Sequence, residues 1–119
     1  MEKVNLAEKF SKIERPWTPF LVGELNGQYV KLARCEGEMI WHSHENEDEL
    51  FFVVRGLLRI HLRDRRVDIQ EGEFFIVPKG VEHKPEALMP TELMLFEPKE
   101  TAHTGRVESH LTHNDQSWL

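Results

Sequence analysis

Two histidines and a glutamate are the side chains of this 119-residue sequence whose types and spacing point most clearly to a chemical function. His42 and His44 lie two residues apart, and Glu49 follows five residues after His44. Because side chains at i and i+2 of a strand point to the same face, both imidazoles can aim at one point. The intervening residues 45–48 (ENED) are too polar to continue a buried strand, so they predict a loop that returns Glu49 beside the histidines. The three residues therefore predict most of a metal site.

A fourth ligand is available at His83, which follows the Pro78-Lys79-Gly80 turn. This turn restricts the backbone, so the imidazole can be held in place. Three neutral imidazoles and one carboxylate suit a divalent transition metal such as Fe, Mn, Ni, Co or Zn. Four protein ligands leave coordination positions for water, a substrate oxygen or dioxygen. A surface or hydrogen-bonded role is the interpretation for the other four histidines, which are His61, His103, His110 and His113.

The elements that must position these ligands are predicted to be β-strands. An Asn26-Gly27 pair joins two β-type runs, 20–25 and 28–36, and predicts a type I′ hairpin because both central residues need positive φ. Gly37-Glu38 predicts a turn, and residues 39–44 a strand that carries His42 and His44. Further strands are predicted over 50–56, 58–64, 67–69, 73–77 and 91–97. About eight short strands separated by glycine or proline turns favour a sandwich or barrel.

Two other segments have alternative interpretations. Residues 5–13 place Leu6, Phe10 and Ile13 at helical spacing behind a possible Asn5 cap, which predicts a short helix whose apolar face covers a barrel end or a partner subunit. The basic run 63–66 (RDRR) suggests phosphate binding, but a solvated turn at a hairpin tip is the favoured interpretation.

The composition excludes several classes of function. Fifteen Lys and Arg against 21 Asp and Glu give a formal charge of −6, which argues against a nucleic-acid or anionic-membrane surface. Cys35 is the only cysteine, so no intrachain disulfide can form, and a buried thiol in a cytoplasmic protein is expected. Neither a leader sequence nor a transmembrane run is recognisable. We expect one domain, residues 1–119, with no nucleic-acid or membrane partner.

The spacings resemble the two motifs of the cupin family. The first motif is matched by Gly37, His42, His44, Glu49 and Gly56, and the second by Gly72, Pro78, Gly80 and His83. The resemblance covers residues 30–97 approximately. Two departures are that Gly37 precedes His42 by five residues where the family has six, and that Ala87 replaces the usual final asparagine.

The resemblance implies an all-β fold, a double-stranded β-helix (jelly-roll) barrel with a short N-terminal helix, and a metal held inside by His42, His44, Glu49 and His83. The chain is most similar to small single-domain cupins often labelled mannose-6-phosphate isomerase-like. That label describes a barrel more than an activity, because one fold carries many reactions.

The leading functional hypothesis is a metal-dependent enzyme, of isomerase or dioxygenase type, acting on a small polar metabolite such as a sugar, sugar acid or keto/enol compound. The alternatives are a non-enzymatic binding or sensing module and a structural cupin with a vestigial site. Phe51 and Val53 are expected to line the barrel, with Phe52 and Val54 pointing outward and favouring a homodimer. Further candidates for the pocket wall, with barrel packing or a surface position as the alternative, are Ile40, Tyr29, Arg34 and Glu82.

Overall fold

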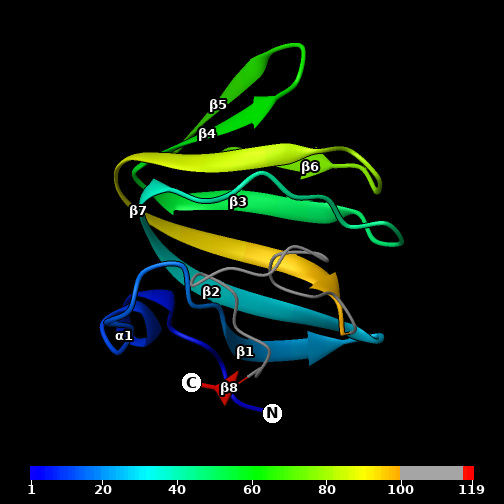
Figure 1. Ribbon diagram of the computed structural model, residues 1–119. Helices are drawn as coiled ribbons and strands as arrows, with labels where there is room; N and C mark the ends of the chain where they lie inside the picture. Colours follow the sequence, from blue (N-terminus) through cyan, green and yellow to red (C-terminus); the bar gives the residue numbers. More distant parts are fainter. Residues whose placement is uncertain (100–116) are drawn as a thin grey trace.

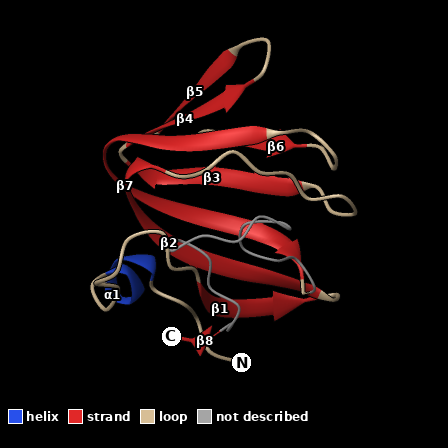
Figure 2. Ribbon diagram, in the orientation of Figure 1, coloured by secondary structure: helices blue, strands red, loops and turns tan. Residues whose placement is uncertain are grey.

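The computed structural model describes residues 1–99 and 117–119 and consists of one short helix and eight strands (Figures 1 and 2). The elements are α1 (Leu6–Phe10), β1 (Phe20–Leu25), β2 (Gln28–Glu38), β3 (Glu49–Arg55), β4 (Leu57–Leu62), β5 (Arg66–Gln70), β6 (Phe74–Val77), β7 (His83–Pro98) and β8 (Ser117–Trp118). No helix in the described part of the chain is both long and apolar enough to cross a bilayer.

The strands form a jelly-roll barrel organised around the long strand β7. Its first half, from His83 to Ala87, pairs antiparallel with β4, and its second half, from Leu93 to Phe96, pairs antiparallel with β3. Along its other edge β7 pairs with β2, and the order continues from β2 to β1 and β8. The hydrogen-bonded order does not close into a ring. The predicted β fold is thus confirmed as an open jelly roll in which β7 belongs to both layers.

The halves of β7 meet beside the turn that joins β3 to β4 (left side of Figure 1). Gly56 forms this turn with φ of 107°, a conformation that L-residues with a side chain rarely adopt. A Cβ added at Gly56 would lie 2.5 Å from Thr91 Oγ1 and 2.8 Å from the Pro90 carbonyl oxygen. The Leu57 amide also donates to Thr91 Oγ1. Glycine is therefore required both for its backbone conformation and for the close approach of β7.

Local turn chemistry explains several predicted elements. Asn26 and Gly27 both have positive φ, 50° and 77°, as the predicted hairpin turn requires. Asn5 caps α1 by accepting a hydrogen bond from the Glu8 amide. Alternation along β3 buries Phe51 and Val53 in the barrel core, whereas Val54 packs on the outer face.

Three predicted boundaries are wrong. Gly37 is not in a turn: β2 continues to Glu38 through an irregularity between Cys35 and Gly37. The strand predicted over 91–97 is only the second half of β7. Residues 39–44 form no regular strand, and His42 alone makes an isolated antiparallel bridge, to His83.

The helix covers the outer face of the sheet and not a barrel end. Phe10 and Ile13 pack with Val22 of β1 and Leu32 of β2 in a cluster separate from the barrel core. This places one apolar outer face against a segment of the same chain, as seen beside β1 and β2 in Figure 2. The separate barrel core lies between the layers and includes Ala33, Cys35, Phe51, Val53 and Leu93.

Candidate metal centre

Backbone hydrogen bonds bring the two histidine-bearing segments together. The His42 amide donates to the His83 carbonyl at 3.0 Å, and the His83 amide donates to the His42 carbonyl at 2.9 Å. Although 39–44 is not a regular strand, this bridge fixes His42 against the start of β7. His44 is tied to the turn before His83 because the Gly80 amide donates to the His44 carbonyl at 2.7 Å.

The predicted loop at 45–48 returns the chain to Glu49, the first residue of β3. Asp48 Oδ1 accepts a hydrogen bond from the Lys79 amide at 2.9 Å, which connects this loop to the Pro78–Gly80 turn. Glu49 itself lies opposite Val77 in the β3–β6 pair. Hydrogen bonds within the protein therefore hold the 45–48 loop and the Pro78–Gly80 turn in place without a bound ion.

The four predicted ligands lie in one buried cluster. One nitrogen from each of His42, His44 and His83 and one oxygen from Glu49 all lie within 4.8 Å of one another. His44 Nε2 is 3.2 Å from Glu49 Oε1, and His83 Nε2 is 3.6 Å from the same oxygen. No one of the four residues is more than 5% exposed. Protein nitrogens and oxygens bind a zinc-sized ion at about 2.1 Å, so two ligand atoms lie at most about 4.2 Å apart, and a small contraction suffices to bind an ion.

Hydrogen bonds set the histidines in the state that metal binding requires. His42 Nδ1 lies 2.9 Å from the Ile40 carbonyl, and His83 Nδ1 lies 3.0 Å from the Val81 carbonyl. A carbonyl only accepts, so each Nδ1 carries the proton and donates it, leaving the Nε2 lone pair free. Metal-binding histidines are oriented in the same way by donation from the second ring nitrogen.

Three polar atoms of the cluster have no hydrogen-bond partner among the described residues. They are His44 Nε2, Glu49 Oε1 and His83 Nε2, all fully buried. Buried polar groups are almost always satisfied, and leaving one unsatisfied costs about 1–3 kcal/mol. A cation among these lone pairs would satisfy all three, so the donor set fits a divalent transition metal.

The electrostatic environment keeps the ligands largely in their metal-binding forms. Burial, together with His83, lowers the pKa of His42 to about 4. Burial also lowers the pKa of His44, but the neighbouring Glu49 carboxylate outweighs it and raises that pKa overall. Although burial opposes it, His44 and His83 hold the pKa of Glu49 well below its usual range. Glu49 is therefore an anion, and a proton competes with any bound metal for His44.

A second buried charged group, which the sequence reasoning missed, lies beside Glu49. Lys31 Nζ donates to Glu97 Oε1 at 2.6 Å, and both side chains are at most 3% exposed. Burial and the Glu49 charge raise the pKa of Glu97 well above its usual range, while Lys31 opposes the shift. Strand alternation puts Lys31 on the same face as Ala33 and Cys35, and this spacing is the signal that the sequence offers for its burial.

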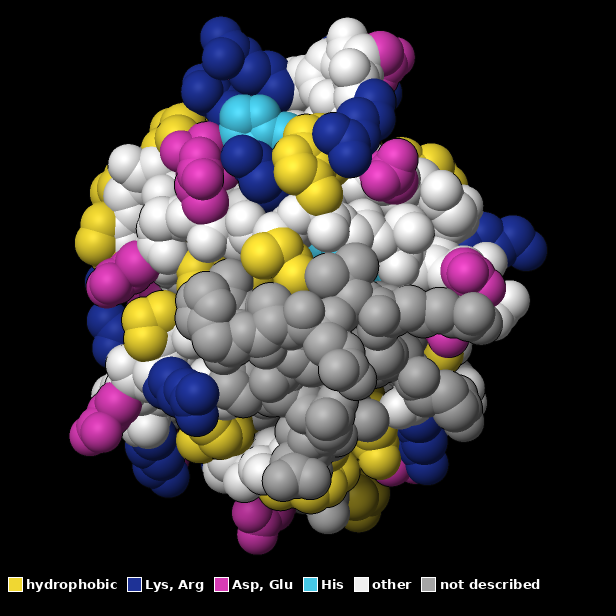
Figure 3. Space-filling model, in the orientation of Figure 1, with side chains coloured by type: hydrophobic (Ala, Val, Ile, Leu, Met, Phe, Trp, Pro, Cys, Tyr) yellow, Lys and Arg dark blue, Asp and Glu magenta, His cyan; other side chains and the backbone are white. Residues whose placement is uncertain are grey.

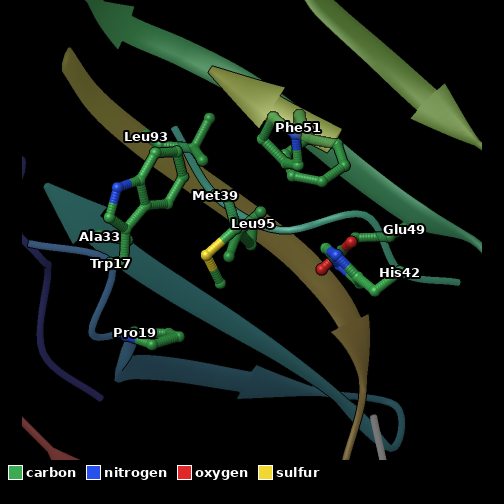
Figure 4. Close-up of a pocket in the computed structure, with 10 residues that line it drawn as sticks. Trp17, Pro19, Ala33, Met39, His42, Glu49, Phe51, Leu93 and Leu95 are labelled. Atoms are coloured by element: carbon green, nitrogen blue, oxygen red, sulfur yellow. The ribbon is translucent and has the colours of Figure 1, made fainter. Parts of the chain in front are cut away.

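A narrow cavity of about 30 Å³ reaches the cluster at His42 and Glu49 (Figure 4). That space suits two or three water-sized groups. Of the six residues predicted to line the barrel or the pocket, Phe51 lines this cavity, and Val53 is buried elsewhere in the core. The other lining residues are Trp17, Pro19, Ala33, Met39, Pro85, Leu93 and Leu95.

The remaining candidates for the wall lie elsewhere. Ile40 does not line the cavity, but its carbonyl accepts a hydrogen bond from His42. The neighbouring residue Met39 lines the cavity instead. The Tyr29 ring packs edge-on against Trp118. Arg34 donates to the Ile13 carbonyl, and Glu82 pairs with Arg63 at 3.3 Å. Nothing in the sequence pointed to these tertiary contacts of Ile40, Tyr29, Arg34 and Glu82.

The other predicted features have structural roles. His61 Nε2 lies 2.8 Å from Glu86 Oε1, as expected for a hydrogen-bonded surface histidine. His103, His110 and His113 lie outside the described residues. Cys35 is buried, and burial raises the pKa of its thiol. Arginines gather at the exposed tip of the β4–β5 hairpin (upper part of Figure 3), where Arg63 stacks over Trp41 at 3.8 Å.

Comparison with known proteins gives consistent matches. A protein-family model described as a cupin domain matches residues 28–110. The uncharacterised protein YdbB of Bacillus subtilis is 30% identical over 97 residues, which cover 81% of this chain and 86% of YdbB.

Two solved structures are also similar. A cupin-2 domain containing protein from Shewanella frigidimarina has 42% identity and a TM-score of 0.79, covering 81% of this chain and 94% of its own. Protein NMB1881 from Neisseria meningitidis has 30% identity and a TM-score of 0.75, covering 82% and 100% respectively.

Proposed function

Since the chain belongs to the cupin family, we propose that it is a metal-dependent enzyme, of isomerase or dioxygenase type, that acts on a small oxygen-bearing metabolite. The observation that carries this proposal is the convergence of three buried atoms without hydrogen-bond partners, His44 Nε2, Glu49 Oε1 and His83 Nε2. A divalent cation placed among them would satisfy all three atoms at once. His42 completes the ligand set and faces the cavity.

The residues of the chain would prepare this centre for catalysis. The carbonyls of Ile40 and Val81 hold two imidazole rings in place. The cavity places apolar side chains on one side of the cluster, and electrostatic interactions are stronger in such low-dielectric surroundings. A bound divalent ion would supply a Lewis acid that polarises a carbonyl or hydroxyl pair, and iron(II) would also support oxidation by dioxygen. Sugars, sugar acids and keto/enol compounds all carry such oxygens.

Metal analysis tests the ligand set. Protein purified without chelators is expected to contain close to one equivalent of a divalent transition metal. His44→Ala should reduce the content by at least tenfold, because the substitution removes one of four ligands. His61→Ala is the matched control, since His61 pairs with Glu86 outside the cluster. Equal metal content in His44→Ala and the parent protein would disprove the site.

Turnover distinguishes an enzyme from a binding module. The metal-loaded protein should be incubated with sugars, uronates and diketones, with and without iron(II) in air. Product formation that is lost in His44→Ala supports the enzyme proposal. Saturable binding of a compound without conversion would instead assign the protein to the alternative, a small-molecule binding or sensing cupin.

We also propose a homodimer formed through the outer face of β6 and β3. Phe74 and Ile76 are exposed there, at 60% and 47%, and their cross-strand partners are Phe52 and Leu50. β6 pairs only with β3, so its other edge has unpaired backbone groups among the described strands. Sedimentation at micromolar concentration is expected to give twice the mass of the chain, and Phe74→Arg should shift the protein to a monomer.

A further inference from the structure

The wall of the cavity restricts which ligand can reach the centre. Of the ten described residues that line it, eight are apolar, and the two polar ones, His42 and Glu49, belong to the candidate metal site. Figure 4 shows Trp17 and Ala33 at one end of the cavity and His42 with Glu49 at the other. A molecule in this cavity would therefore meet polar side chains at one end alone.

Trp17 does not change this polarity, although indole carries a hydrogen-bond donor. Its Nε1–H donates to the Glu36 carbonyl at 2.7 Å, so the donor is already used. The Trp17 amide donates to the Arg34 carbonyl at 2.8 Å and fixes the backbone with φ of 57°, which is unusual for a large residue. These contacts hold the hydrocarbon part of the indole in the cavity wall.

We propose that the ligand of this centre has an oxygen-donor head for the metal and a short hydrocarbon body for the cavity beside Trp17, Met39 and Phe51. The inference rests on the proposed function and narrows its substrate class to small keto, enol or hydroxy compounds with an alkyl end. A sugar or sugar acid would bury hydroxyl groups against the apolar side chains of the described wall, which is unfavourable for binding. The volume of about 30 Å³ favours a body of one or two carbons.

Two 2-hydroxy acids of nearly equal size provide the test. 2-Hydroxybutyrate and glycerate share the hydroxy-carboxylate head. 2-Hydroxybutyrate ends in a methyl group where glycerate ends in a hydroxyl group. Each is titrated into protein loaded with Co²⁺, and binding is followed by the visible absorption of the ion. 2-Hydroxybutyrate is expected to bind about 10- to 100-fold more tightly, the range by which a hydrophobic pocket discriminates one methyl-sized group.

Polar substitutions in the wall should reduce this preference. Met39→Gln and the smaller change Ala33→Ser each place a hydrogen-bonding group in the cavity, and the ratio of the two dissociation constants should fall to about threefold or less in Met39→Gln. Met89→Gln is the matched control, because Met89 is 52% exposed and outside the cavity. It should keep the parent preference.

The outcomes separate this inference from the proposed metal function. Failure to bind Co²⁺ would reject the proposed function. Stoichiometric Co²⁺ binding with glycerate bound as tightly as 2-hydroxybutyrate would reject the apolar-body inference alone. A preference unchanged in folded Ala33→Ser and Met39→Gln would also reject it, and the wild-type comparison decides the matter even if Met39→Gln does not fold.

Discussion

Replacing Lys31 by Met should destabilise the protein strongly because it leaves Glu97 buried without its cation. The Nζ–Oε1 distance is 2.6 Å, and the side chains are 3% and 2% exposed. Removing one partner of a buried ion pair costs about 3–5 kcal/mol. With an unfolding entropy of about 2.1 cal/mol/K per residue, 1 kcal/mol corresponds to about 4 °C in a chain of 119 residues. The expected loss in Tm is therefore about 12–20 °C near pH 8.

The loss should depend on pH in a defined direction. The pKa of Glu97 is already raised by burial and by Glu49, and removal of Lys31 would raise it further. A carboxyl group with a raised folded-state pKa stabilises the protein below its unfolded pKa, about 4.3, and this stability is lost as pH rises toward the folded-state value. Keeping the proton on Glu97 costs about 1.4 kcal/mol for each pH unit above the unfolded pKa, until the folded-state pKa is reached. The loss in Lys31→Met should therefore shrink to about 1 kcal/mol at pH 5.

Thermal and urea unfolding of chelator-treated protein would measure the effect, since bound metal would add its own stabilisation. Lys99→Met is a matched control, because Lys99 contacts Glu24 at a similar 2.7 Å on the surface, and a cost of at most about 1 kcal/mol is expected. The double variant Lys31→Met/Glu97→Met should recover most of the loss. A cost below about 1 kcal/mol for Lys31→Met at pH 8 would refute a stabilising role for the pair.

Three further predictions follow from the site and the turns. Metal affinity should fall about tenfold per pH unit once the pH drops below the pKa of His44, which is raised above the ordinary imidazole value of about 6.5. His42 resists protonation down to about pH 4. Chelator competition at pH 5, 6 and 7 measures this, and a flat profile contradicts histidine ligation. Gly56→Ala should lower the free energy of unfolding by about 2–4 kcal/mol, because the added Cβ strains the backbone and contacts Thr91. Gly72→Ala should cost less, because nothing lies within 4 Å of a Cβ there. Equal urea midpoints for the two variants would contradict this. Removal of metal should lower the Tm by an amount that grows with the metal concentration used in the loaded sample, and calorimetry that shows no such dependence would argue against binding to the folded state.

Local chemistry accounts for the parts of the fold that could be predicted. Positive φ at Asn26 and Gly27, the Asn5 cap and the alternation of Phe51 and Val53 each depend on neighbours along the chain. The full length of β7 could not be read in this way because Pro85 and Pro90, which lack an amide proton, resemble strand ends. Residues 39–44 have an apolar and aromatic composition typical of a strand, but their backbone contacts go to Pro85, His83 and Gly80 in turn, and only His42 forms a β-bridge.

The same distinction between local and long-range contacts applies to the candidate site. The spacing of His42, His44, Glu49 and His83 was enough to predict that they would lie together, because family motifs carry long-range information. The Lys31–Glu97 pair has no motif, and its partners are 66 residues apart. Only the β2–β7 register, which sets Tyr29 opposite Glu97, reveals it. A lysine in a strand is otherwise read as a surface residue.

The geometry also explains why one site can depend on so little regular structure. The ligands come from the irregular segment 39–44, the start of β3 and the start of β7, and two mutual hydrogen bonds between His42 and His83 join the first and last of these. Gly80 and Lys79 add backbone contacts to His44 and Asp48. These contacts fix the backbone before a metal binds, so less conformational entropy is lost on binding. The unsatisfied atoms of His44, Glu49 and His83 also favour binding of the ion, since they leave the metal-free centre less stable. Preorganised backbone and unsatisfied side chains together account for a buried, polar centre within an otherwise apolar barrel.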